Sequence, residues 1–263
     1  MNSYKNWLSF FLATLALAAQ SVLAHDPVFG LGSHTLFKGG VELHLGTHMD
    51  PSGVSSLSPE FSVKYGITSN WAVGASLSYD HKSGTQKASS LFSKYRFWRV
   101  DSFKEQESAA LFTKIILKGE RADHVSQRTG NDYLLGLSYG YEGRKWYRWA
   151  AIRHRLNSDT NSGLKRPGVW LVDLVGGIRF VPTGYHEPDW VWMLELNGEK
   201  TERINRPSGI RIGGQQWFLS PGLMWTHRNF AVKSGIQVSL FDDFHQDQNP
   251  DNYRLKVELE WHL

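Results

Sequence analysis

The chain has 263 residues, of which 41% are hydrophobic and 13% aromatic; it contains 25 glycines and no cysteine, and its formal net charge is +4 at pH 7. Acidic and basic residues nearly balance and no basic aromatic motif is present, so the sequence predicts no nucleic-acid partner. Disulfide bonds are excluded, so stability must come from a large core or a large hydrogen-bonded framework.

Residues 1–24 have the three parts of a secretory signal peptide. Lys5 supplies a positive charge, residues 7–19 form an apolar core, and Val22 and Ala24 precede a suitable cleavage site. The apolar core is short for a membrane-spanning helix, and an uncleaved N-terminal helix is the alternative. We therefore predict an exported protein whose mature chain begins at His25.

The next segment, 25–40, reads HDPVFGLGSHTLFKGG and has no clear periodicity. Gly30, Gly32, Gly39 and Gly40 permit turns, because glycine tolerates backbone angles that other residues avoid. We predict that this segment is a periplasmic strap or plug that enters the structure formed by residues 41–263.

From residue 41 onward, apolar and polar residues alternate with a period of two, which is typical of strands with one apolar face. In the last segment, YRLKVELEWHL, every second residue is apolar or aromatic, and charged residues or histidine stand between them. About twelve strands are predicted, at 41–49, 57–65, 71–80, 88–98, 107–118, 131–141, 145–156, 168–180, 189–198, 214–226, 230–241 and 252–263.

Several features favour a membrane-spanning barrel over a soluble β-sandwich or a lipocalin-like barrel, which are the alternatives. Trp and Tyr lie near strand ends, the polar faces carry charges of both signs, and short turns alternate with longer polar loops. We predict an all-β fold, a transmembrane antiparallel up-and-down β-barrel of about 12 strands over 41–263. It would lie in the bacterial outer membrane in contact with lipid, with both termini periplasmic because the strand number is even.

Two short segments, YGITSNWAVGASLSY at 65–79 and FLSPGLMW at 218–225, resemble a family of bacterial outer-membrane barrels. Members of that family are transporter-like proteins, some of them linked to meta-pathway phenol degradation. The first segment is similar to the family's first periplasmic hairpin and the second to one of its later strands. The resemblance implies a barrel that passes or binds small polar or aromatic solutes, and it leaves the solute and the oligomeric state open.

The polar strand faces predict which side chains line the lumen. Their mixed charges can fill the lumen through cross-lumen ion pairs, or basic clusters such as Arg153 with Arg155 can select anionic solutes. Since a wet lumen tolerates charge, Glu195→Arg should be accepted, whereas Leu194→Arg should impair membrane insertion. The predicted lumen or solute-binding residues are Glu42, His44, His48, Arg153, Arg155, Asp173, Arg179, Glu195, Arg254, Lys256 and Glu258.

Histidines near the start of the mature chain support a second hypothesis, the handling of copper, zinc or nickel. Imidazole suits these ions, and cleavage before His25 would add a free α-amine as another nitrogen donor. His44 and His48 share a strand face but lie too far apart to hold one ion, so residues 25–40 would have to fold beside them. The predicted divalent-metal ligands are His25, His34, His44 and His48, and no other cofactor is predicted.

An outer-membrane lipid hydrolase is the remaining alternative. The stretch RHRLNSDTNSG at 153–163 contains His154, Asn157 and Ser158, the residue types that an outer-membrane phospholipase uses. On a strand, His154 and Ser158 would lie about 13 Å apart, and a nucleophile needs its base within hydrogen-bond reach. We therefore predict no catalytic residue and no enzymatic activity.

Overall fold

The structure is a computed structural model that describes residues 25–50, 56–80, 86–103, 105–118, 128–183, 186–205, 211–244 and 250–263. The predicted signal peptide at 1–24 lies outside these residues. Within the described ranges, no helix is long and apolar enough to cross a membrane.

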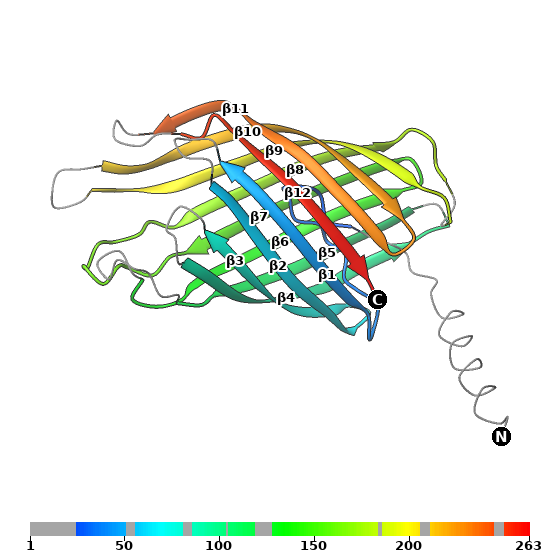
Figure 1. Ribbon diagram of the computed structural model, residues 1–263, viewed down its shortest axis with the longest axis horizontal. Helices are drawn as coiled ribbons and strands as arrows, with labels where there is room; N and C mark the ends of the chain where they lie inside the picture. The colour runs from blue at the N-terminus through cyan, green and yellow to red at the C-terminus, as the bar shows by residue number, and fades with distance from the viewer. Residues whose placement is uncertain are drawn as a thin grey trace, which may run out of the picture.

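The described residues form twelve strands that close into one antiparallel barrel (Figure 1). Each strand pairs with its neighbours in sequence, and β1 pairs with β12 to complete the ring. The predicted barrel of about twelve strands is therefore confirmed. The strands are β1 (Val41–Asp50), β2 (Ser56–Thr68), β3 (Trp71–Asp80), β4 (Gln86–Asp101), β5 (Glu105–Ile116), β6 (Asp132–Gly143), β7 (Trp146–Leu156), β8 (Val169–Arg179), β9 (Asp189–Asn205), β10 (Arg211–His227), β11 (Phe230–Phe244) and β12 (Tyr253–His262).

The main departure from the predicted boundaries concerns β9 and β10. The polar stretch between them was expected to be a loop from 198 to 214, but the two strands pair as far as Arg211 opposite Asn205. The register shifts between Ile212 and Gly214, where Gly213 has φ +112°, a conformation that favours glycine. Beyond the apolar band a polar sequence can continue as strand, because pairing still satisfies its backbone groups.

The barrel has an apolar outside and a polar inside. On the outside Leu194 and Val257 are 53% and 50% exposed, whereas Glu195 and Glu258, on the opposite faces of the same strands, are 0% and 4% exposed. A soluble barrel has the reverse arrangement, because water would surround its outer face. An exposed belt of large apolar side chains around a charged interior is the pattern of a barrel surrounded by lipid.

Aromatic side chains form a girdle at the barrel end with the short turns. Trp71 and Trp146 begin β3 and β7, whereas Trp98 and Trp261 lie near the ends of β4 and β12, so strand direction brings all four to this end. The Phe230 ring stacks on Trp261 with the centroids 5.5 Å apart. Such girdles lie at the boundary between hydrocarbon and water in membrane barrels.

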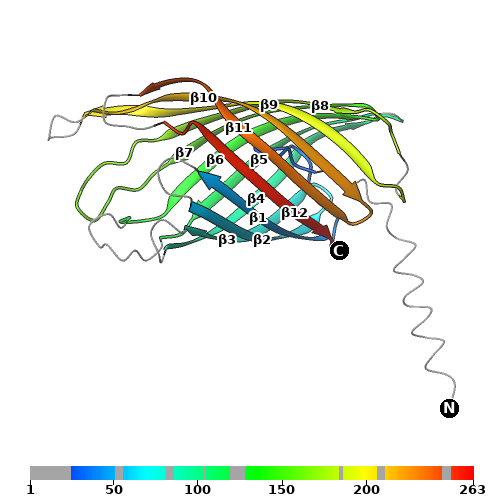
Figure 2. The ribbon, with the colours of Figure 1, turned by 45° about the horizontal axis from the view of Figure 1, so that its top comes forward.

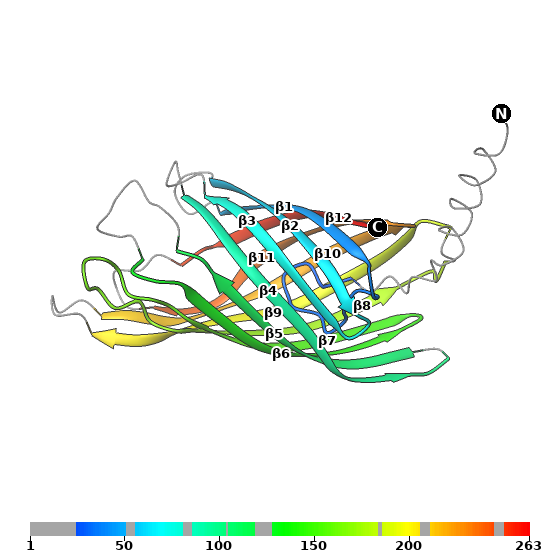
Figure 3. The same cartoon turned by 90° about the horizontal axis from the view of Figure 1, so that it is seen from below.

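The C-terminus lies at the same end. The backbone N–H of Leu263 donates to the carbonyl of Val41 at 2.8 Å, which ties the last residue to the first strand. β1, β11 and β12 run obliquely to the long axis of the molecule (Figure 2), and closure of a sheet into a barrel requires such a tilt. Residues 25–40, here called the N-terminal segment, run inside the ring of strands (Figure 3).

Candidate functional site

The N-terminal segment occupies part of the barrel interior. Val28, which is fully buried, belongs to an apolar cluster with side chains from four strands. This cluster comprises Val28, Tyr147, Trp149, Val175, Val191, Met193 and Met224, with Phe29 packed against it. A segment that buries apolar side chains in this way is held by the hydrophobic effect as well as by polar contacts.

The carboxylate of Glu195 is the main polar anchor of the segment. It accepts hydrogen bonds from the backbone N–H groups of Val28 at 2.8 Å, Phe29 at 3.2 Å and Gly30 at 2.8 Å. A Cβ atom at Gly30 would lie 3.2–3.3 Å from Val175, Asp173 and Glu195, so a side chain there would crowd the wall. Successive backbone N–H groups that converge on one oxyanion form a favourable anion site.

Two lysines of the wall bind the carbonyl side of the same segment. Lys256 Nζ donates to the carbonyl oxygen of Val28 at 2.6 Å, and Lys233 Nζ donates to that of Asp26 at 3.2 Å. Wall and segment therefore exchange hydrogen bonds in both directions, so the backbone polar groups at this depth have partners.

Asp26 links the segment to the opposite wall. Its carboxylate accepts hydrogen bonds from Lys94 Nζ at 2.9 Å and from the backbone N–H of Gly32 at 3.0 Å, and Lys64 Nζ lies 3.7 Å away. Burial by itself would raise the pKa of Asp26, but the ammonium groups of Lys94 and Lys64 outweigh burial and hold the pKa well below its ordinary value. Asp26 was not among the predicted site residues.

The segment leaves the interior beside β2. The N–H of Gly39 donates to the carbonyl of Gly66 at 2.7 Å, and the N–H of Gly66 donates to that of Gly40 at 2.9 Å. Gly39 has φ +82°, which glycine adopts without strain. A Cβ atom at Gly66 would lie 2.0 Å from the Phe37 carbonyl oxygen, so the close approach requires glycine at this position.

The charged wall residues pair mostly between neighbouring strands, rather than across the lumen as predicted. The pairs are Glu42–Lys64, His44–Glu258, Arg153–Asp173 and Arg179–Asp189. Arg254 differs, because it reaches from β12 to Glu199 on β9 at 2.6 Å. Adjacent strands are about 4.8 Å apart, whereas barrel diameter grows with strand number and places facing walls beyond the reach of most side chains.

These pairings also reduce the unbalanced charge of the predicted basic clusters. Arg254 is neutralised by Glu199 and Asp251, and Lys256 lies 2.6 Å from Glu258. Arg155 lies on the same face of β7 as Arg153, while His48 is exposed near the far end of β1. The geometry therefore does not favour strong selection of anions by Arg254 and Lys256.

A cavity of about 190 Å³ lies between the N-terminal segment and the wall of β1–β5, β11 and β12. Lysines and carboxylates both line it, and the rings of Phe92 and Phe112, 6.2 Å apart, add an apolar side. The charged lining residues are Asp26, Glu42, Glu60, Lys64, Lys94, Lys114, Lys233, Lys256, Glu258 and Glu260.

The four histidines predicted to hold a metal have different partners. His34 lies 3.2 Å from Glu142, and His44 lies 3.0 Å from Glu258. His25 Nδ1 lies 2.8 Å from Glu260 Oε2. Among the described residues, groups with metal-ligand spacing are His25–Glu260–His262 and His44–Glu258–Glu260, and neither contains two of the predicted histidines. Glu260 and His262 were not among the predicted ligands. Alternation places both on the polar face of the last strand, but nothing in the sequence places His25 beside them.

The residues considered for lipid hydrolysis also have separate partners. His154 stacks on Trp170 and lies 3.3 Å from Glu202, whereas Ser158 Oγ donates to the Gly130 carbonyl at 3.0 Å. Asn157 donates to the carbonyl of Pro167 at 2.6 Å. Each side chain thus serves the local structure at the end of β7.

Solved structures with a similar fold include the COG4313 outer membrane channel from Pseudomonas putida F1, with a TM-score of 0.62 and 12% identity over 91% of this chain and 100% of that chain. The NanC porin has a TM-score of 0.50 and 9% identity, over 85% of this chain and 100% of that chain. The sequence matches no protein family and no curated protein. At these identities the likeness concerns the fold, and it confirms the predicted resemblance to outer-membrane barrels.

Proposed function

We propose that this protein is an outer-membrane channel for small polar or aromatic solutes and that its N-terminal segment is a plug. The observation that carries the proposal is the cavity of about 190 Å³ beside that segment, inside a barrel with a lipid-compatible exterior. The shared fold of a channel and a porin supports the same function.

The proposed orientation places the barrel end with the short turns in the periplasm. The aromatic girdle and Leu263 lie at this end, as does Val41, where the N-terminal segment joins β1. Bacterial outer-membrane barrels have short periplasmic turns and longer extracellular loops, and an exported chain would then keep both termini periplasmic.

The cavity favours small solutes that combine an apolar ring with a polar group. Phe92 and Phe112 offer ring faces, and Lys114, two residues from Phe112 on the same face of β5, offers a hydrogen-bond donor. A cavity of about 150 Å³ can bind benzene, so the 190 Å³ here has room for one small ring. Larger solutes would pass only after the N-terminal segment moves.

Planar-bilayer conductance and liposome flux of benzoate and arabinose test the proposal. We expect low conductance from the protein as purified and higher conductance, with faster benzoate flux, from a variant that lacks residues 25–40. Asp26→Asn provides a full-length variant in which the plug is loosened without deletion. Folded protein that passes neither solute in any of the three forms would contradict the proposal.

A further inference from the structure

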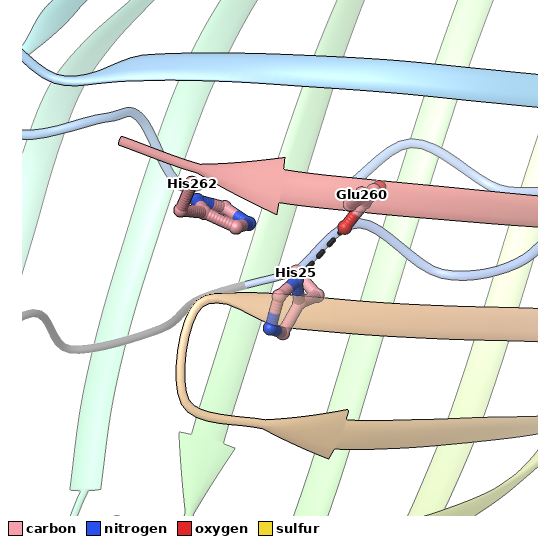
Figure 4. Close-up of side chains that lie close together, drawn as sticks. All are labelled: His25, Glu260 and His262. Carbon is pink, nitrogen blue, oxygen red and sulfur yellow. Dashed lines mark hydrogen bonds and ion pairs between the residues drawn. The ribbon is translucent and has the colours of Figure 1, made fainter.

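His25, Glu260 and His262 form a buried cluster where the N-terminal segment meets the last strand (Figure 4). Glu260 and His262 are two residues apart on β12 and therefore share its inner face. The His25 ring meets the His262 ring edge to face, with the centroids 4.9 Å apart. The three side chains are 5%, 4% and 8% exposed.

Both imidazoles have a nitrogen that needs a partner. Among the described residues, His25 Nε2 and His262 Nε2 are buried and accept or donate no hydrogen bond. Burying a polar atom without a partner is unfavourable, and such atoms in a folded protein call for an explanation. At His262 a bound metal ion would use this nitrogen, whereas at His25 it would bind Nδ1, the nitrogen that lies 2.8 Å from Glu260.

The surroundings suit a metal ligand set. Glu42 lies 3.9 Å from His262 Nδ1, too far for a hydrogen bond, and Nε2 of the same ring has no hydrogen-bond partner among the described residues. Lys233 binds Glu260 Oε1 at 2.5 Å, whereas Glu260 Oε2 faces His25 Nδ1 at 2.8 Å. One carboxylate oxygen is thus neutralised and the other is directed at the cluster.

We propose that His25, Glu260 and His262 bind one divalent transition-metal ion, Cu(II) more tightly than Zn(II). Imidazole suits both ions, and Cu(II) generally binds a given site more tightly than Zn(II). Cleavage after Ala24 would add the α-amine of His25, which can form a chelate ring together with Nδ1. The site would join the start of the N-terminal segment to β12, and it does not depend on the barrel being a channel.

Only small movements are needed to form the site. The ligand atoms of the three residues already lie within 4.8 Å of one another. Metal–nitrogen bonds are about 2.0–2.1 Å, so ligands that share an ion lie at most about 4 Å apart. Rotation of the two rings, which opens the His25–Glu260 hydrogen bond, would close the difference.

The second cluster, His44–Glu258–Glu260, is a weaker candidate. Glu258 is held by Lys256 at 2.6 Å and by Lys233 at 2.9 Å, on different oxygens. Both carboxylate oxygens therefore already face ammonium groups, and His44 would be the one nitrogen ligand. An ion there would have to displace two lysines.

Calorimetry on the untagged protein, purified from membranes in detergent with its N-terminus verified by mass, tests the proposal with Cu(II), Zn(II) and Mg(II). We expect one Cu(II) per chain, weaker Zn(II) binding and no Mg(II) binding. His262→Gln and Glu260→Gln should weaken Cu(II) binding at least about tenfold. The matched control is His227→Gln, a histidine at the end of β10 outside the cluster.

Electron paramagnetic resonance of the Cu(II) complex keeps the proposal testable if a variant does not fold. Coupling to two or more nitrogens is expected in the parent protein, and a form whose N-terminal α-amine is acetylated should lose the amine contribution. Absence of stoichiometric Cu(II) binding would overturn the proposal. Equal loss of binding in His227→Gln, or unchanged binding in a folded His262→Gln, would overturn it as well.

Discussion

The carboxylate of Glu195, in the barrel wall, accepts a 2.8 Å hydrogen bond from the backbone N–H of Val28 in the N-terminal segment. The two residues are 167 positions apart in the sequence, and both are fully buried. This contact makes a wall carboxylate part of the attachment of the segment. Its removal is therefore a direct way to ask what the segment does.

Glu195→Gln should loosen the N-terminal segment. The amide group keeps one acceptor oxygen but turns an N–H donor toward other N–H donors, and hydrogen bonds to a charged group contribute about 1.5–3 kcal/mol each. The chain has no cysteine, so Leu31→Cys provides a single thiol in the buried part of the segment. We expect thiol labelling to be at least about tenfold faster with Glu195→Gln.

The matched control for this variant is Glu107→Gln. Glu107 accepts a hydrogen bond from the Tyr139 hydroxyl at 2.8 Å near the outer surface, away from the N-terminal segment. The Glu107→Gln variant should leave the labelling rate of the Leu31→Cys thiol unchanged. Equal acceleration in both variants would mean that general loosening of the barrel, and not the loss of this anchor, exposes the thiol.

Acidification should release the segment through Asp26. The pKa of Asp26 is held well below its ordinary value, because Lys94 and Lys64 outweigh the opposite effect of burial. A carboxylate with a lowered pKa stabilises the docked segment fully above its ordinary pKa of about 4, and this contribution is lost as the pH falls through the lowered value. Conductance should therefore rise below about pH 4.

Asp26→Asn separates this effect from other titrations. The variant lacks the charge at every pH, so its conductance should already be raised at pH 7 and should rise less between pH 4 and pH 2.5. A pH response identical to that of the parent protein would show that other carboxylates control the segment.

Arginine should distinguish the two faces of the barrel. Val257→Arg places a charge on the apolar outer face of β12, where it would cost about 2–4 kcal/mol at the centre of a membrane. Ser62→Arg places the same residue in the wet cavity. We expect Val257→Arg to reduce the yield of heat-modifiable folded protein in lipid vesicles and Ser62→Arg to fold normally with lower conductance. The opposite order of folding yields would contradict the face assignment.

Gly66→Ala should detach the end of the N-terminal segment. The new methyl group would overlap the Phe37 carbonyl oxygen, which lies 2.0 Å from the ideal Cβ position, so the paired backbone hydrogen bonds with Gly39 and Gly40 must open. Such crowding costs about 1–3 kcal/mol. Hydrogen exchange should become faster at the two N–H groups that donate these bonds, those of residues 39 and 66. The control is Gly176→Ala, because a Cβ atom at Gly176 would have no other atom within 4 Å. In this variant the same N–H groups should exchange at the rate of the parent protein.

The strands and their two faces could be predicted from the sequence alone. Alternation is a local property, and a strand with lipid on one side and a polar interior on the other must place its apolar residues at every second position. Leu194 and Glu195 could therefore be assigned to opposite faces without knowing their neighbours. The polar extension of β9 and β10 could not be predicted in this way, because only pairing with the neighbouring strand distinguishes such a polar stretch from a loop.

The tertiary structure decided what the inward-facing residues contact. Alternation suggested that Glu195→Arg would be tolerated in a wet lumen, but Glu195 binds the N-terminal segment, and its replacement by a cation would oppose three N–H donors. Likewise, His25 meets Glu260 across 235 residues only because β12 closes the ring beside the folded-back segment. Such contacts depend on barrel closure, on strand register and on the path of the N-terminal segment, which has no periodicity. None of these three can be predicted from the local pattern of residues.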